Sequence, residues 1–415
     1  MPVKRNRRRT VAQNHEQIRY KRKKSPCQHA DSRSGKIMRS STSYPCLPEV
    51  VVKPGIKELT LVLCKTKREY NFPCSLLSDG VQNSIRYLKL NWCAFRPTAE
   101  LGPLRSLTSL HLRFVSITGE ELQCLLSNSP ALEELHLSNC MEIICLKIPC
   151  TLQKFRYLYV MGWCSLKVLE NKAPNLSSFF LRGSVKLSLG DTLQMKKLDV
   201  VHSLHYARSV LPSVMPNLES LQITSGCEVV NTTMLPTKFF LHLKNLTIHL
   251  ISGLAFSPTY DYFSLVSFFD ASPSLETLIL NVRQQDMKHE SVLAKSSDLR
   301  EIPENRHSCL KSVKISGFSS AKSLVELTCY IIKNMVSLES LTLDTICVDR
   351  SISCYLKTFR MCYPIGEGAL MEAPRALSAI RTYIEAIVPS TFKLTVLKPC
   401  SRCHVKGIPR CISNT

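Results

Sequence analysis

Apolar residues recur along this chain in the pattern apolar-x-x-apolar-x-apolar, which twelve segments between Ile56 and Leu343 follow. Their mean spacing is about 26 residues, a period typical of repeat architectures. In the fullest examples, an apolar stretch leads through a short break into a segment that reads Leu-Glu-x-Leu-x-apolar. These examples are Leu125–Leu137, Leu211–Ile223, Phe268–Leu280 and Ile331–Leu343. The pattern therefore predicts a series of short strands joined by return segments.

Alternation within each predicted strand directs the apolar side chains into the repeat and the intervening ones away from it. One repeat cannot bury its apolar face alone, so neighbouring repeats must stack. We therefore predict an α/β leucine-rich-repeat solenoid, with a curved parallel sheet on the concave side and helices and irregular turns on the convex side. The alternative is an ordinary α/β domain with scattered strands. The other eight repeats have their apolar positions at Ile56/Leu59/Leu61, Ile85/Leu88/Leu90, Leu107/Leu110/Leu112, Phe155/Leu158/Val160, Leu176/Phe179/Leu181, Met195/Leu198/Val200, Leu243/Leu246/Ile248 and Leu310/Val313/Ile315.

The best helix signal inside the repeats is a capping box. Thr118 and Glu121 have the spacing at which each side chain satisfies the other's free backbone N–H. Apolar residues follow at helical spacing, so we expect a helix from about Gly119 to Ser127. Phe263–Asp270 and Ser323–Met335 are predicted to be equivalent helices.

Other stretches between the repeats predict little helix. Residues 140–200 are rich in short strand-like pieces, which predicts extended chain or turns on the convex side there. Longer spacings predict insertions at residues 253–262 and 286–307. Such loops either carry binding residues or are tolerated insertions without a role.

The pattern changes after Gly366, where a helix is predicted. Its apolar stripe comprises Leu370, Leu377, Ile380, Ile384 and Ile387, and a strand through Phe392, Leu394 and Val396 follows. A solenoid needs such a cap because its last repeat would otherwise expose an apolar face. Pro374 is expected to kink this helix or to move its start to about Ala373.

The formal net charge of +22 is unevenly distributed, because residues 1–40 hold 13 Lys and Arg against 2 Asp and Glu. This tail has few apolar residues and is predicted to be disordered. Its basic clusters suit an import receptor or nucleic-acid phosphates, and the alternative is a solvated leader without a partner. The candidate import signal comprises Lys4, Arg5, Arg7, Arg8, Arg9, Arg19, Lys21, Arg22, Lys23 and Lys24.

Nothing in the sequence predicts export or a membrane span. No apolar run approaches the ~18 residues that cross a bilayer, and the N-terminus lacks the apolar core of a secretory signal. We therefore expect a protein of the nucleus, the cytoplasm or both. The nineteen cysteines are predicted to be reduced thiols. Cys64, Cys93 and Cys140 follow predicted strands, where a leucine-rich repeat commonly places Asn or Cys.

Signals for catalysis or cofactor binding are weak. The sequence contains no phosphate-binding GxxxxGK[ST], no GxGxxG after a strand, no HExxH and no GxSxG. Cys400-Ser401-Arg402-Cys403-His404 matches the spacing of haem attachment or of half a zinc site, but no second ligand pair is evident. We expect a protein that is not an enzyme and holds no cofactor or metal.

The outward position between the last two apolar residues of each repeat marks the concave surface. His111 and His136 occupy it in successive repeats, at about 5 Å from each other, and a pair of histidines alone is not expected to bind metal. The face is a candidate site for an unknown client protein, although any solvated sheet face has a similar mixture of side chains. The candidate residues are Lys89, His111, His136, Tyr159, Phe180, Asp199, Gln222 and Lys314, and the remaining outward positions are Thr60, Thr247, Ile279 and Thr342.

Four stretches resemble the plant F-box/leucine-rich-repeat family that ends in an FBD-like segment. They are NHEQIRYKRKKS (Asn14–Ser25), SNSPALEELHLSNC (Ser127–Cys140), ENKAPNLSSFFLRG (Glu170–Gly183) and MEAPRALSAIRTYIEAIVPSTFKLTVLKPCSRCH (Met371–His404). The resemblance implies a protein-interaction scaffold like the substrate-recognition part of an SCF-type ubiquitin ligase. The Cys400–His404 spacing then belongs to the family's C-terminal segment.

Members of that family have an F-box of some forty residues before the repeats, and here its body is missing. Leu47-Pro48-Glu49-Val50 looks like an F-box start, but Val51–Gly55 leads directly into the first repeat. A Skp1-type adaptor is a family partner that this chain is not expected to bind. The expected division is a leader over 1–50, a solenoid over 51–360 and an FBD-like cap and tail over 361–415. The alternative function is nuclear nucleic-acid association through the basic tail.

Overall fold

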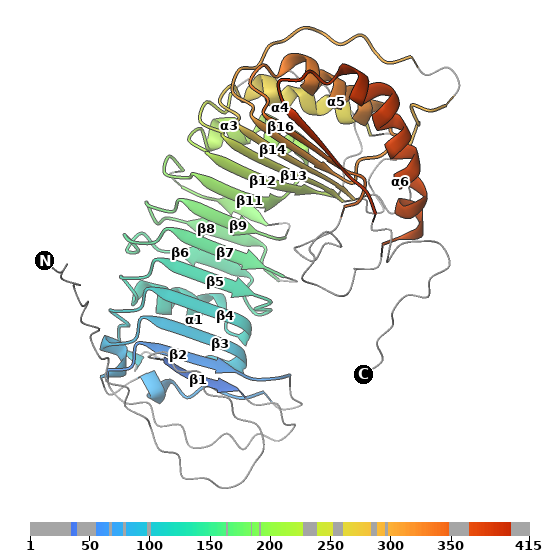
Figure 1. Cartoon of the computed structure of the whole chain (residues 1–415). Coiled ribbons are helices and arrows are strands. Elements are labelled where there is room, and N and C mark those ends of the chain that lie inside the picture. Colours follow the sequence, from blue (N-terminus) through green and yellow to red (C-terminus); the bar gives the residue numbers. More distant parts are fainter. Residues whose placement is uncertain are drawn as a thin grey trace, which may run out of the picture.

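The computed structural model describes residues 35–39, 55–65, 69–77, 80–97, 101–162, 165–183, 185–190, 192–226, 239–251, 260–283, 289–294, 298–347 and 365–399. Within this part of the chain, fourteen strands form one sheet in which all neighbours are parallel. The sheet curves from β1 to β17, and helices α4 and α5 lie on the outer side of the curve (Figure 1). In spatial order the strands are β1 (Gly35–Arg39), β2 (Glu58–Val62), β3 (Tyr87–Ala94), β4 (Ser109–Ser116), β5 (Glu134–Ser138), β7 (Tyr157–Met161), β9 (Ser178–Leu181), β11 (Lys197–Val201), β12 (Ser220–Ser225), β13 (Asn245–Ile251), β14 (Thr277–Arg283), β15 (Ser312–Ser316), β16 (Ser340–Asp344) and β17 (Lys393–Leu397).

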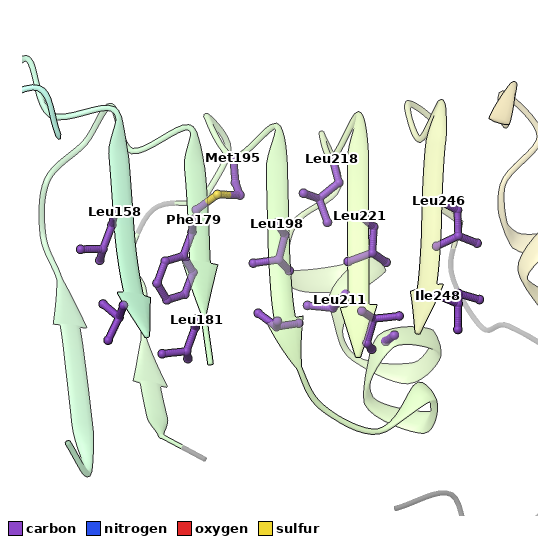
Figure 2. Close-up of a cluster of buried hydrophobic side chains, with 14 of the residues drawn as sticks. Leu158, Phe179, Leu181, Met195, Leu198, Leu211, Leu218, Leu221, Leu246 and Ile248 are labelled. Carbon is purple, nitrogen blue, oxygen red and sulfur yellow. The ribbon is translucent and has the colours of Figure 1, made fainter. Parts of the chain in front are cut away.

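The leucine-rich-repeat prediction is confirmed, because all twelve segments with the apolar pattern form strands of this sheet. Burial alternates along them as the period of two requires: Leu135 and Leu137 of β5 are buried, whereas His136 between them is only half-buried. Figure 2 shows side chains such as Leu158, Phe179 and Leu221 on the same side of successive strands. These side chains form one continuous hydrophobic core.

Helices return the chain between several strands. The predicted capping box is present: Glu121 donates its backbone N–H to Thr118 Oγ1 at 3.2 Å, and Thr118 donates its own to Glu121 Oε2 at 2.8 Å. The helix it begins, α1, spans Gly119–Ser127 as predicted. The two other predicted helices are also confirmed. The first corresponds to η4 (Tyr262–Leu265) and α4 (Val266–Ala271), and the second to α5 (Lys322–Asn334). The remaining return helices are η1 (Cys74–Leu77), η2 (Val81–Asn83), α2 (Leu204–Ser209) and α3 (Leu211–Val214).

Extended chain replaces helix on the convex side between residues 140 and 200, as predicted. A second parallel sheet has the order β10-β8-β6, with β6 at Cys145–Ile148, β8 at Val168–Asn171 and β10 at Lys186–Ser188. Asn171 Nδ2 donates to the carbonyls of Ala173 and Leu189 at 3.0 and 3.2 Å, which ties successive turns together. Of the two predicted insertions, residues 253–259, 286–288 and 295–297 lie outside the described part.

The C-terminal cap forms, but its helix differs from the prediction. Helix α6 spans Glu367–Ala379 and continues through a π-helical turn, η5 (Ile380–Ile384), and a 3₁₀ turn, η6 (Glu385–Ile387). The prediction that Pro374 moves the helix start to about Ala373 is wrong, because Pro374 lies inside α6, which begins seven residues earlier and continues beyond it. The predicted kink stays a prediction. Pro374 is exposed, so the lack of its N–H removes a hydrogen bond from the solvent side of the helix.

The predicted stripe of the cap is also partly wrong. Ile380 and Ile384 are fully buried, but Ala373 and Ala376 fill the positions nearest the solenoid, whereas Leu370 and Leu377 are only half-buried. Strand β17 then pairs in parallel with β16, so the sheet continues into the cap.

A buried polar cluster fixes α6 to the last repeats. Glu372 accepts hydrogen bonds from Ser320 N at 2.7 Å and Ser320 Oγ at 2.6 Å, and His289 Nε2 lies 3.3 Å from its Oε1. Both the His289 and Glu372 side chains are 5% exposed. Burial opposes ionisation of Glu372, but the hydrogen bonds from His289 and Ser320 outweigh it and lower its pKa.

The sheet has an additional strand at its N-terminal edge. Strand β1 pairs in parallel with β2, although its residues fall in the stretch for which composition predicts disorder. Of the three cysteines that follow predicted strands, Cys93 and Cys140 are buried, whereas Cys64 is exposed. The cysteines in the described ranges are free thiols. No helix in those ranges is both long and apolar enough to cross a bilayer.

Candidate functional site

The outward residues predicted to mark the concave surface lie in one continuous row. Strand register places Lys89 beside His111, His111 beside His136, and His136 beside Tyr159. It continues through Phe180, Asp199, Gln222, Thr247, Ile279, Lys314 and Thr342 to Thr395 of β17. The sequence thus located this row correctly. That its residues bind a partner stays a prediction.

Six rings from β3, β4, β5, β7 and β9 stack into what we call the aromatic ladder: Tyr87, His111, His136, Tyr157, Tyr159 and Phe180. The His111 and His136 rings are parallel within 15°, with centroids 3.8 Å apart, closer than the strand spacing alone predicts. Tyr159 and Phe180 stack at 4.2 Å, and Tyr87 and Tyr157 flank the histidines at 5.0 Å each. His136 and Tyr159 join the two halves at 5.4 Å. The ladder is a continuous surface of half-buried rings.

Burial in the ladder suppresses charge on its titratable rings. Desolvation, together with smaller effects of the neighbouring His136 and Lys89, lowers the pKa of His111 to about 4. Desolvation also lowers the pKa of His136, although Glu134, 3.8 Å from its Nε2, opposes the shift. Burial raises the pKa of Tyr87 and Tyr157. At neutral pH the ladder is therefore an uncharged ring surface with neutral imidazoles.

A polar cluster continues the row beyond Phe180. The Arg182 guanidinium lies 5.3 Å from the Phe180 ring centroid, and its Nη2 is 3.9 Å from Asp199 Oδ1. Gln222 Nε2 donates to Asp199 Oδ2 at 2.7 Å. Burial raises the pKa of Asp199 to about 6, against the opposing effect of Arg182. A partly desolvated carboxylate next to a cation and an amide offers hydrogen-bond specificity beside the apolar rings.

A second ring pair lies at the C-terminal ends of β3 and β4. Trp92 and Phe114 stack with centroids 4.0 Å apart and planes within 7°, and Lys65 and Arg113 lie over them at 6.0 and 5.4 Å. Both aromatic residues have positive φ, 57° and 51°, which bulky side chains rarely adopt. This backbone shifts the alternation by one residue, so the rings face outward and Cys93 takes the buried position that the period of two assigns to Trp92.

The candidate residues chosen from sequence are not all close together. Lys89 through Gln222 occupy seven adjacent strands, but Lys314 lies three strands beyond Gln222, roughly 14 Å along the sheet. Glu134, Tyr87, Tyr157 and Arg182 were missed, although each lies two residues from a row position and therefore faces the same side. The signal was available, because the same period of two that locates one outward residue in a strand locates its neighbours.

Two predicted features fall outside the described residues. The basic clusters of the candidate import signal lie in residues 4–24, and the CxxCH spacing lies in residues 400–404. The import, nucleic-acid and C-terminal-segment interpretations therefore stay predictions from sequence.

Comparison with known proteins gives a family match and two relatives. A profile described as the At1g61320/AtMIF1 LRR domain matches residues 13–401. The FBD-associated F-box protein At1g61320 of Arabidopsis thaliana is 23% identical over 321 residues, which cover 70% of this chain and 67% of the relative. The putative FBD-associated F-box protein At1g61330 of the same plant is 22% identical over 326 residues, covering 71% and 70%. Among solved structures, the pneumococcal vaccine antigen PcpA is similar at 13% identity over 84% of this chain and 81% of that chain, with a TM-score of 0.16.

Proposed function

Because the chain belongs to the At1g61320/AtMIF1 leucine-rich-repeat domain family, we propose that it recognises a protein client on the concave face of its sheet. It acts as a binding scaffold rather than as an enzyme. The names of its relatives describe FBD-associated F-box proteins, and the client-selecting role is carried over from that class. The domain division into a leader over 1–50, a solenoid over 51–360 and a cap over 361–415 is part of the same proposal.

The aromatic ladder is the observation that supports this proposal most strongly. Interface energy is concentrated in a few anchors, and Tyr, Trp and Arg are enriched among them. Tyr159 and Phe180 present stacked rings next to Arg182, and all three are half-buried. Their neighbours in the sheet hold them in place, so a client binds to a surface with little rotamer freedom left to lose.

Recruitment to a ligase is the part of the family role that we propose this chain lacks. The F-box body expected between Leu47–Val50 and the first repeat is missing from the sequence. Without its helices, a Skp1-type adaptor has no docking surface of the usual kind. The chain therefore binds a client without delivering it to the ligase. Stoichiometric co-purification of such an adaptor with the full chain contradicts this part of the proposal and leaves client binding untouched.

A site-specific crosslinking experiment tests client binding. A photo-reactive phenylalanine analogue replaces Tyr159 in the full chain, which is then irradiated in plant extract and its adducts are identified by mass spectrometry. The matched control carries the analogue at Lys147, an exposed position of β6 in the convex sheet. We expect one discrete adduct from position 159 and none of the same mass from position 147. Identical adduct patterns from both positions contradict a client site on the concave face.

A further inference from the structure

We propose that His111, Glu134 and His136 bind a divalent transition-metal ion, with Zn²⁺ the best fit, on the outward face of β4 and β5. One ligand atom from each residue can be chosen such that all three lie within 4.8 Å of one another. The site goes beyond client recognition, since it is complete in the isolated protein and does not require a client.

Sheet geometry brings the three side chains together. His111 and His136 are register partners on adjacent strands, and Glu134 lies two residues before His136, so it faces the same side. His136 Nε2 is 3.8 Å from Glu134 Oε2. Backbone hydrogen bonds between the parallel strands hold β4 and β5 in place, and the site needs no movement of the main chain.

The distances require a modest side-chain adjustment to hold an ion. Tetrahedral zinc, with bonds of about 2.0–2.2 Å, places its ligand atoms roughly 3.3 Å apart. The two imidazoles now stack within 15° of parallel, so one ring must turn about χ2 to direct its lone pair at the shared point. The χ2 wells of histidine are broad, and such a turn is inexpensive. Glu134, whose side chain is 52% exposed, is free to follow.

The donor set selects the class of metal. Two imidazoles and one carboxylate suit Zn²⁺ and other late first-row divalent ions, whereas Mg²⁺ and Ca²⁺ prefer oxygen ligands only. Three protein ligands on a solvent-facing sheet leave the fourth position for water or for a donor group of another molecule.

Two neighbours modulate the site in opposite directions. The Ser109 hydroxyl lies 3.0 Å from His111 Nε2 and 3.5 Å from Glu134 Oε2, so it links two of the ligands and holds them near each other. Lys89 is the register partner of His111, and its positive charge disfavours a second cation there. Removal of the Lys89 charge is therefore expected to strengthen zinc binding, a result that a cluster with only a structural role would not give.

Titration of the purified full chain with Zn²⁺ under reducing conditions, in competition with a metal-sensitive dye, tests the proposal. We expect His111→Gln, Glu134→Gln and His136→Gln each to weaken the site at least tenfold and Lys89→Gln to strengthen it. His249→Gln is the matched control, since His249 lies on the same face in β13 and His249 Nδ1 is 3.2 Å from Asn281 Nδ2. This variant is expected to match the wild type. Unchanged affinity in the three ligand variants, or an equal loss in the control, overturns the proposal.

The many cysteines require a second readout that identifies the ligands. Co²⁺ bound by imidazole and carboxylate gives visible bands without thiolate charge transfer, whereas a cysteine site gives that charge transfer in the near ultraviolet. We expect the first equivalent of Co²⁺ to show no thiolate band. Circular dichroism of each variant confirms that it is folded, and a thiolate band at the first equivalent overturns the proposal.

Discussion

Leu158 and Tyr159 are adjacent in β7 but face opposite sides of the sheet. We therefore expect their replacement by alanine to lower the free energy of unfolding by very different amounts. Leu158 is 0% exposed and lies in register between Leu135 and Phe179, which are 0% and 1% exposed. Figure 2 shows Leu158 and Phe179 on neighbouring strands. Tyr159 is half-buried and contacts mainly the rings of the ladder.

The expected magnitudes follow from these surroundings. Leu158→Ala removes three buried carbon atoms, each worth about 0.8 kcal/mol of transfer free energy. The neighbouring strands are held by the sheet and cannot collapse fully into the gap, so a cavity cost brings the loss to about 3–4 kcal/mol. Tyr159→Ala removes one stacked pair, one tilted contact and the hydrogen bond that the tyrosine hydroxyl donates to Met161 Sδ at 2.9 Å, for which about 2 kcal/mol is expected.

Equilibrium unfolding in urea, followed by far-ultraviolet circular dichroism, measures both free energies of unfolding. We expect the midpoint for Leu158→Ala to fall about twice as far as that for Tyr159→Ala, with similar slopes. Separate transitions for different parts of the solenoid are allowed, since each repeat contacts mainly its neighbours. Equal losses for the two variants refute the assignment of these residues to opposite faces and, with it, the location of the proposed binding surface.

Three further predictions concern a helix start, a buried carboxylate and a glycine. Thr118→Ala removes the capping box of α1 and is expected to cost about 1 kcal/mol in urea unfolding, whereas no loss contradicts the role of the cap. Burial raises the pKa of Asp199 from 3.8 to about 6, so the stability associated with its neutral form is complete below pH 3.8 and is lost as the pH rises through 6. Asp199→Asn should abolish this pH dependence and stabilise the protein at pH 7 by at most about 3 kcal/mol. A stability profile between pH 4 and 7 that Asp199→Asn leaves unaltered contradicts the prediction. Gly317 has φ +75°, and a Cβ there would strike the Val282 carbonyl. Gly317→Ala should therefore cost well over the roughly 1–2 kcal/mol expected of Gly102→Ala, because Gly102 has φ +67° but open space around it. Equal losses of stability in the two variants contradict the close approach at Gly317.

The sequence predicted the repeats well because each strand carries its own local signal. An apolar triplet such as Leu132, Leu135 and Leu137 fixes both the strand and its inward face, and a period of two then locates His136 on the other face. The capping box at Thr118 was equally local. Features that depend on contacts between distant segments were not predictable in this way.

The cap and the candidate metal site illustrate such contacts. The burial of Ala373 rather than Leu370 depends on how closely α6 approaches the last repeats, which the stripe of apolar residues does not reveal. The pairing of His111 with His136 was predicted, whereas Glu134 was missed, although its position two residues before His136 directs it to the same face. The positive φ of Trp92 and Phe114 has no sequence signal, since bulky residues normally avoid it.

The affinity of the crosslinked client for Phe180→Ala tests the central claim most directly. Phe180 stacks on Tyr159 and lies under Arg182, at the centre of the proposed surface, whereas Lys147→Ala on the convex sheet is the matched control. If the aromatic ladder anchors the client, Phe180→Ala loses at least about 2 kcal/mol of binding free energy, roughly a thirtyfold rise in Kd, and the control is unchanged. A Kd for Phe180→Ala equal to that of the wild type, in a protein of undiminished helix and strand content, would contradict the account.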